Sequence, residues 1–221
     1  MPRRREQLTL LLDLFPWPED NALTVCDLGA GFGAVTELIL QRYPRATVTC
    51  VDGSSEMMAL ARDRLASHRT RVRFHLADLA DASWTKDLPR PYDAAVSALA
   101  IHHLSDARKR GLYREVFGLL RPGGLFFNND IVTAPPALKD RFEALNLRVI
   151  QDQDRTQHGV ARTLEALQAE MREQLRLAGE RHQSHIAALP RQLEWLVEAG
   201  FKSVDCYWKY LDLAIFGGIR E

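Results

Sequence analysis

The sequence has little of three things that would each indicate a class of protein. Its three cysteines, Cys26, Cys50 and Cys206, lie far apart in apolar runs, which predicts buried, reduced thiols rather than disulfides or metal ligands. No apolar run approaches the roughly 18 residues that a membrane span needs. Lys plus Arg and Asp plus Glu both number 29, so no excess of charge draws nucleic acid or anionic membrane to the whole surface.

The N-terminus is basic at residues 2–5, but amphipathic sequence follows and not the apolar core of a signal peptide. We therefore expect a cytoplasmic protein that does not bind membranes. The equal numbers of positive and negative side chains make nucleic acid an unfavourable partner, although they do not exclude a local basic patch.

The chain is long enough for one domain over residues 1–221, because 221 residues of which 46% are hydrophobic can bury a sizeable core. Within residues 1–20 a helix is expected, with Leu8, Leu11, Leu12 and Phe15 on one face, ending before the prolines that follow. Beyond it, short apolar runs alternate with stretches of helical spacing. The expected strands are 23–28, 47–51, 71–76, 92–100, 125–132, 201–208 and 211–216.

This alternation predicts the fold class: an α/β protein with a doubly wound, mostly parallel sheet of about seven strands and helices on both faces. Residues 121–124, Arg-Pro-Gly-Gly, are expected to form a turn before the fifth strand. Few residues separate the last two strands, so they should pair antiparallel as a hairpin.

A helical insertion is expected at 135–190, between the fifth and sixth strands. Two apolar stripes at helical spacing follow Pro136. The second stripe, which includes Leu164 and Leu167, suits an ordinary packed helix, a homodimer contact or a mobile lid, and the sequence does not decide between them.

A glycine-rich loop follows the first strand, with glycines at 29, 31 and 33. These glycines let the backbone turn sharply and approach a ligand closely, and free N–H groups at the start of the next helix favour an anionic group. The spacing is G-x-G-x-G, not the G-x-G-x-x-G of dinucleotide sites, which argues against NAD. By itself, such a loop also suits a plain tight turn.

Two carboxylates end the next two strands. Asp52 closes the second strand, where it can accept hydrogen bonds from both ribose hydroxyls, or simply act as a turn or capping residue before Gly53. Asp78 follows the third strand and can accept from an exocyclic amine such as that of adenine, or stay solvated. Because parallel strands present their carboxyl ends at one edge, the loop and both carboxylates should meet there.

These motifs resemble those of the class I S-adenosylmethionine-dependent methyltransferases, of the small-molecule, type 11/12-like kind, over most of the chain from Leu23 to Phe216. Residues 92–97 with 100–104 look like the fourth motif of that family, and 120–124 like its turn before strand five. The resemblance implies S-adenosyl-L-methionine as cofactor, with no metal. The residues that it implies for binding the cofactor are Asp27, Gly29, Ala30, Gly31, Asp52, Gly53, Met57, Asp78, Leu79 and Ser97.

The resemblance also implies transfer of a methyl group to an O, N or C nucleophile of a small metabolite. A base helps where the acceptor starts protonated, and His102 or His103, just past the fourth strand, could supply it, or one of them could cap or pack under the turn at Ser105. Asp130 and His158 are candidate substrate contacts by position.

Alternatives remain open at this point. One is a tRNA-modifying enzyme of the same fold, although the fourth motif lacks the Asn-Pro-Pro-Tyr form of many base-modifying enzymes. Others are transfer of another group derived from the cofactor, a non-catalytic module that binds the cofactor, and a dehydrogenase.

Overall fold

The computed structural model describes residues 2–157, 159–181 and 185–221. Its centre is a seven-stranded sheet in the order β3-β2-β1-β4-β5-β7-β6. The strands are β1 (Thr24–Leu28), β2 (Thr47–Asp52), β3 (Val72–Leu76), β4 (Tyr92–Ala98), β5 (Leu120–Ile131), β6 (Lys202–Tyr210) and β7 (Leu213–Arg220). The helices are α1 (Arg4–Asp13), α2 (Ala34–Arg42), α3 (Ser55–Arg64), α4 (Asp106–Leu119), α5 (Lys139–Gln157), α6 (Leu164–Arg181) and α7 (Leu189–Ala199), with short 3-10 turns at Ala66–Arg71, Ala82–Thr85, Ile101–His103 and Pro136–Leu138.

The pairing confirms the predicted doubly wound sheet. β3, β2, β1, β4 and β5 are parallel, whereas β7 inserts antiparallel between β5 and β6. The last two strands form the expected hairpin, in which Tyr210 pairs with Leu213.

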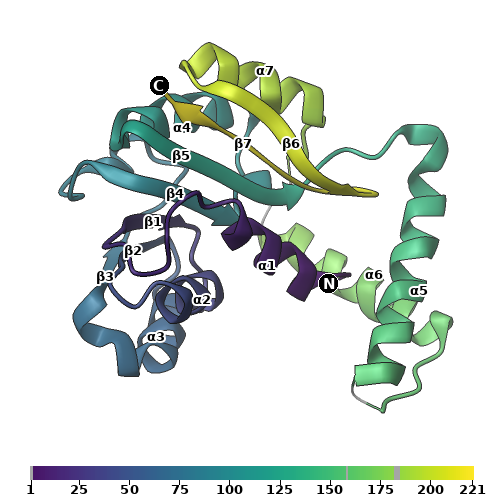
Figure 1. The fold of residues 1–221 in the computed structure, drawn as a ribbon. Coiled ribbons are helices and arrows are strands. Elements are labelled where there is room, and N and C mark those ends of the chain that lie inside the picture. The colour runs from purple at the N-terminus through teal and green to yellow at the C-terminus, as the bar shows by residue number, and fades with distance from the viewer. Residues whose placement is uncertain (1, 158, 182–184) are drawn as a thin grey trace.

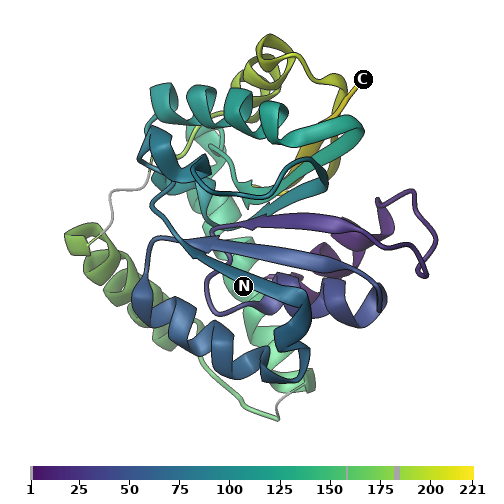
Figure 2. The ribbon, with the colours of Figure 1, turned by 90° about the vertical axis from the view of Figure 1, so that its left-hand side faces the viewer.

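Helices cover both faces, as Figures 1 and 2 show. One core lies between the sheet and α1, α2 and α3, where Leu11, Ile39 and Ala61 are fully buried. The other lies between the sheet and α4 and α7, where Leu112 and Leu196 are fully buried. Strands buried on both faces have few polar positions, which explains why β1 and β4 are nearly continuous apolar runs.

The turn predicted at 121–124 before the fifth strand was wrong. β5 already begins at Leu120, which pairs with Tyr92, and the register then shifts so that Ala94 pairs with Leu125. Gly123 has a φ of 76° inside this segment, a conformation that glycine adopts readily and that allows the irregularity within the strand. α7 begins at Leu189, and Pro190 occupies its first turn.

The predicted insertion forms a hairpin of α5 and α6 that stands away from the sheet (Figure 1). The chain returns across the ends of β4 and β5, where the N–H of His185 donates to the His102 carbonyl at 2.8 Å and the N–H of Thr133 donates to the Ala187 carbonyl at 3.1 Å. In the part of the chain that the structure describes, no helix is long and apolar enough to cross a membrane. The cysteines are free, and Cys26 and Cys50 are buried as predicted, whereas Cys206 is half-buried.

Candidate functional site

The carboxyl ends of the parallel strands meet at one edge of the sheet, and most of the predicted site residues lie there. The glycine loop follows β1, Asp52 is the last residue of β2, and Asp78 lies two residues past β3. The 3-10 turn with His102 and His103 follows β4, and Asp130 is the penultimate residue of β5.

The glycine loop needs its glycines for different reasons. At Gly29 the φ is 65°, and a Cβ would lie 2.1 Å from the Cβ of Ala100, so the loop touches the segment after β4. At Gly31 the φ is 54° and a Cβ would meet nothing within 4 Å, which leaves open space above the loop. Gly33, with a φ of 83°, is the N-cap of α2, and a Cβ there would lie 2.9 Å from the Leu65 side chain.

Asp52 ties the loop to the end of β2. Its carboxylate accepts hydrogen bonds from the N–H of Gly31 at 2.8 Å and the N–H of Ser54 at 2.9 Å. The side chain is half-buried, and a carboxylate has about four acceptor positions. Asp52 therefore keeps acceptor capacity for a ligand hydroxyl while it orders the loop.

The next position along the edge is formed by the end of β3. Asp78 is exposed and accepts from the N–H of Ala80 at 2.8 Å, whereas Leu79 is buried. A Cβ on Gly53 would lie 3.4 Å from the Asp78 Cα, so the ends of β2 and β3 are in contact. Met57, at 40% exposed, presents an apolar surface in the first turn of α3, the helix that follows β2. This arrangement offers an apolar face and a carboxylate to a flat, amine-bearing ring.

Some of the predicted residues lie inside the fold. Asp27 is fully buried and accepts from the Thr36 hydroxyl at 2.7 Å, and burial raises the pKa of its carboxyl to about 6. Ser97 is also fully buried, and its hydroxyl donates to the Leu28 carbonyl at 2.8 Å, which joins β4 to β1 beneath the loop. Ala30 is buried as well, and its N–H donates to the Val51 carbonyl at 3.0 Å.

His102 and Asp130 form a buried pair at the ends of β4 and β5. The His102 Nδ1 lies 2.6 Å from Asp130 Oδ1, and the backbone N–H of His102 donates to Asp130 Oδ2 at 2.9 Å. The carboxylate accepts from Nδ1, so this nitrogen carries the proton, and in the neutral ring Nε2 has the lone pair. Asp130 therefore fixes both the tautomer and the orientation of the ring.

The neighbours of this pair come from the following helix and the returning segment. The His103 ring lies 4.0 Å from the His102 ring, centroid to centroid. Lys109 is fully buried, donates to the His185 carbonyl and lies 3.6 Å from Asp106; burial lowers the pKa of its ammonium. The cap of α4 is Ser105 itself, whose hydroxyl accepts from the Arg108 N–H. The predicted residue His158 lies outside the described residues.

Several residues at this edge were missed from the sequence. Leu99 has a φ of 61°, an uncommon conformation for leucine, and its N–H donates to the Asn129 carbonyl at 2.9 Å. Arg4 and Gln7 on α1 carry buried polar atoms, and so does Asn129 on β5. The basic stretch at 3–5 is the sequence signal for Arg4.

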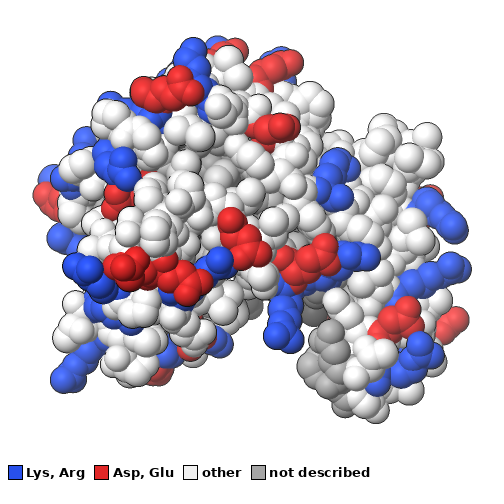
Figure 3. Space-filling view, viewed as in Figure 1, with Lys and Arg blue, Asp and Glu red and all other residues white. Residues whose placement is uncertain are grey.

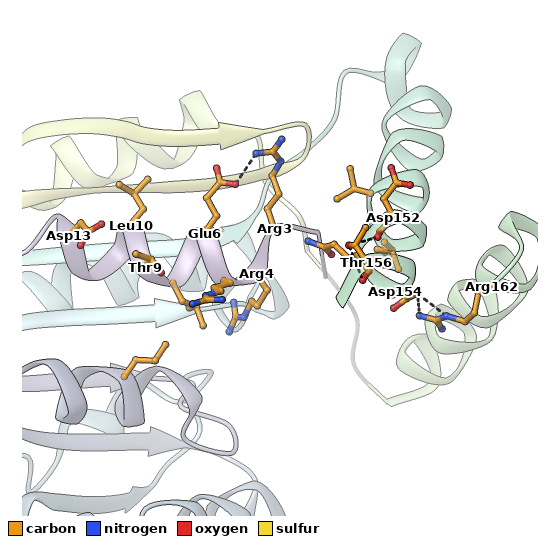
Figure 4. Close-up of a pocket in the computed structure, with 16 residues that line it drawn as sticks. Arg3, Arg4, Glu6, Thr9, Leu10, Asp13, Asp152, Asp154, Thr156 and Arg162 are labelled. Carbon is orange, nitrogen blue, oxygen red and sulfur yellow. Dashed lines mark hydrogen bonds and ion pairs between the residues drawn. The ribbon is translucent and has the colours of Figure 1, made fainter. Parts of the chain in front are cut away.

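A groove of about 1530 Å³ separates α1 from the α5–α6 hairpin (Figures 3 and 4). Arginines and carboxylates line it together, and several of them are paired: Arg3 with Glu6, and Arg162 with Asp154 and Glu170. Figure 3 shows the same mixture of signs over this whole face. Among the described residues, no group of three or more His, Cys, Asp or Glu side chains is placed to hold a metal ion.

Comparisons with known proteins relate this site to one family. Residues 25–124 match the model of a family described as a methyltransferase domain. Trans-aconitate 2-methyltransferase of Delftia acidovorans is 38% identical over 110 residues, which are 49% of this chain and 38% of that protein. The matched stretch thus spans about two fifths of the length of the curated relatives.

Solved structures show the same fold over nearly the whole chain. An O-methyltransferase family protein from Burkholderia thailandensis has a TM-score of 0.68 at 20% identity, covering 98% of this chain and 56% of that one. Human N-acetylserotonin methyltransferase, solved in complex with S-adenosylmethionine, has a TM-score of 0.61 at 16% identity, covering 99% of this chain and 51% of that one.

Proposed function

We propose that the chain transfers the methyl group of S-adenosyl-L-methionine to an O, N or C nucleophile of a small metabolite, and the match of residues 25–124 to a methyltransferase domain supports this. One observation carries the proposal above the others. Gly31 donates to Asp52 beneath an open space, at the carboxyl edge where β1 and β2 end side by side. A ligand there meets backbone N–H groups and a carboxylate together.

The residues fit the cofactor. The open space above Gly31 admits a ligand directly against the backbone, and a side chain on Gly29 would clash with Ala100. Asp52 would accept from the ribose hydroxyls, and Met57, Asp78 and Leu79 would surround adenine. Asp27 and Ser97 are fully buried, so they would support the site indirectly. Their hydrogen bonds hold the loop and β4 in place.

The bound cofactor supplies a methyl group that is already activated on a sulfonium, so the chain has to align the acceptor with the C–S bond and exclude water. For an acceptor that starts protonated, His102 would take the proton at Nε2, because its Nδ1 is committed to Asp130 at 2.6 Å. Asp130 is then a positioning residue, which stabilises the imidazolium that forms.

The substrate would enter through the groove between α1 and the α5–α6 hairpin. Its lining carries four arginines and four carboxylates, so it has no excess of positive charge to attract a nucleic-acid backbone. The Delftia relative is named for a small carboxylic acid, which also favours a small metabolite.

Label transfer tests the function. The purified protein is incubated with methyl-labelled S-adenosylmethionine and, in separate reactions, with a deproteinised metabolite extract, with total RNA and with total protein. We expect label in a small molecule that is soluble in acid. Label in RNA alone or protein alone would contradict the proposed substrate class, and no label despite cofactor binding would favour a non-catalytic module.

The proposal extends to compartment and assembly. A cytoplasmic location agrees with three free cysteines, two of which are buried. The α5–α6 hairpin stands away from the sheet and would join two copies. Light scattering after size-exclusion chromatography measures the mass, and a monomer at 25.1 kDa would contradict the dimer.

A further inference from the structure

The turn that follows β3 is fastened to the fold on both sides of Asp78. On one side, the N–H of Ala77 donates to the Asp52 carbonyl at 3.0 Å. On the other side, the Arg108 guanidinium on α4 donates from Nε to the Leu79 carbonyl at 2.6 Å. Two elements that lie far apart in the sequence therefore fix the backbone around Asp78.

Arg108 is itself held by two other side chains. Its Nη1 and Nη2 donate to the two carboxylate oxygens of Glu115 at 2.8 and 2.6 Å, which is the bidentate geometry of a strong ion pair. Glu115 also accepts from the indole N–H of Trp84 at 2.5 Å, and Trp84 is buried. The side chains of Arg108 and Glu115 are only 14% and 23% exposed, so solvent ions screen the pair little. The guanidinium is thus held in one position, and the Leu79 carbonyl is held with it.

The helix α4 leaves room for this guanidinium at Gly111. Glycine is unfavourable in the interior of a helix. A Cβ at Gly111 would lie 3.0 Å from Arg108 Nη1, which is closer than most Cβ contacts. At Gly118, on the same helix, a Cβ would meet nothing within 4 Å. The position of the guanidinium therefore gives a physical reason for glycine at 111.

The fastened turn presents one acceptor and one donor next to each other. The Asp78 carboxylate is exposed, accepts from the N–H of Ala80 at 2.8 Å and has capacity for further hydrogen bonds. In the part of the chain that the structure describes, the Leu79 N–H donates to no acceptor. Adenine has the complementary pair on one edge, because its exocyclic amine donates and the adjacent ring nitrogen accepts. Hypoxanthine has the reverse pair, since its carbonyl accepts and its ring N–H donates.

We infer that Arg108 is a positioning residue that makes the cofactor site selective for adenine. The inference rests on the proposed function, and Arg108 acts through the Leu79 backbone. A fixed turn keeps its donor and acceptor at the spacing that adenine matches, and both face the wrong groups when hypoxanthine replaces adenine. A turn that can move aligns less well with adenine and avoids part of the mismatch with hypoxanthine.

Calorimetry with two ligands tests the inference without turnover. S-adenosylhomocysteine carries adenine, and S-inosylhomocysteine carries hypoxanthine but is otherwise identical. We expect the wild-type protein to prefer S-adenosylhomocysteine by about ten- to a hundredfold. In Arg108→Met this preference should fall to about threefold or less. A purely structural role would instead lower the affinity for both ligands by the same factor.

Arg110→Met is the matched control, because Arg110 lies on the same helix and pairs with Glu198 at 2.6 Å, and it should leave the preference unchanged. If Arg108→Met does not fold by circular dichroism, Arg108→Lys gives the same comparison, since lysine lacks the planar fork and should also lower the preference.

Four results would overturn the inference alone: an unchanged preference in the Arg108 variant, an equal loss for both ligands, a similar loss of preference in Arg110→Met, or equal binding of the two ligands by the wild-type protein. Failure of the wild-type protein to bind either ligand would instead overturn the proposed function.

Discussion

The three carboxylates at the ends of the first strands differ in burial, and burial decides what each can do. Asp78 is exposed, Asp52 is half-buried, and Asp27 is fully buried. Only an accessible carboxylate can accept directly from a ligand, so Asp52 and Asp78 are candidates for contact with the nucleoside. Asp27 instead shapes the loop through Thr36 and sets the charge beneath it.

Asp27→Asn should stabilise the protein at neutral pH. The pKa of Asp27 is about 6 in the folded protein, against 3.8 for an aspartate in the unfolded chain. Ionisation therefore opposes folding once the pH rises through this range. The asparagine can still accept from Thr36 and carries no charge. We expect a gain of about 2 to 3 kcal/mol in the free energy of unfolding at pH 8, from the size of the pKa shift.

Urea denaturation between pH 5 and 8 measures this effect. The difference between variant and wild type should grow from pH 5 to about 6, near the folded pKa, and then stay level. A difference that does not depend on pH would show that Asp27 is not the titrating group.

Gly29→Ala should destabilise the fold more than Gly31→Ala. Both positions have positive φ, which costs about 1 kcal/mol or more for alanine. At Gly29 the new Cβ also overlaps the Cβ of Ala100, and such overpacking adds about 1 to 3 kcal/mol. Thermal unfolding compares the two variants, and adding Ala100→Gly to Gly29→Ala should recover part of the loss. Equal effects at both glycines would argue against the contact.

His102→Gln should lower kcat by about 10² to 10⁴ for an acceptor that must lose a proton, because it removes the proposed base. The affinity for S-adenosylhomocysteine should stay within about twofold, since the change lies outside the cofactor contacts. The adjacent His103→Gln is the control and should retain most of the activity. A kcat that survives His102→Gln would exclude this histidine as the base.

The sequence predicted that the glycine loop, Asp52 and Asp78 lie at one edge of the sheet, because glycine spacing and acidic residues after strands are local signals. It could not show that Ser97 faces inward to Leu28, since that depends on the pairing of β4 with β1. Nor could it predict that Arg4 lies close enough to Asp27 to interact with its charge, because α1 and β1 are brought together only by packing.

At the scale of elements, the alternation of strand and helix was predicted because short apolar runs bounded by turn residues alternate with longer stretches of helical spacing. The turn predicted at 121–124 was wrong for a specific reason. Proline and two glycines indicate a turn, but pairing of Leu120 with Tyr92 extends the strand through them, and a register shift absorbs the irregularity. Tertiary pairing here overrides local turn chemistry.

The start of α3 offers a matched pair of serines. The Ser54 hydroxyl accepts from the Met57 N–H at 3.2 Å, so Ser54 is the N-cap, whereas Ser55 is the first helical residue and is exposed. Ser54→Ala should lower the free energy of unfolding by about 1 kcal/mol, and Ser55→Ala should change it little. Chemical denaturation measures both variants. An equal or larger loss at Ser55 would contradict the assigned cap.

At the scale of the whole molecule, the strand order places β1 and β4 side by side at the middle of the sheet, with helices over both faces. This arrangement brings the glycine loop, the end of β4 and the returning segment at 185–187 to one edge. The alternation of strands and helices along the sequence predicted the layers of helices on both faces of the sheet. It did not predict the position of the α5–α6 hairpin, because an amphipathic stripe does not specify which surface it packs against. The edge proposed to bind the cofactor lies in the matched family stretch, whereas the groove is bounded mainly by α1 and the insertion, outside that stretch.

The central claim is that this edge binds S-adenosylmethionine through Asp52, and calorimetry of the purified protein with that compound and with NAD tests it most directly. We predict saturable binding of S-adenosylmethionine, no binding of NAD, and a loss of about 1 to 3 kcal/mol of binding free energy in Asp52→Ala. Tight binding of NAD without binding of S-adenosylmethionine, or full affinity in Asp52→Ala, would contradict it.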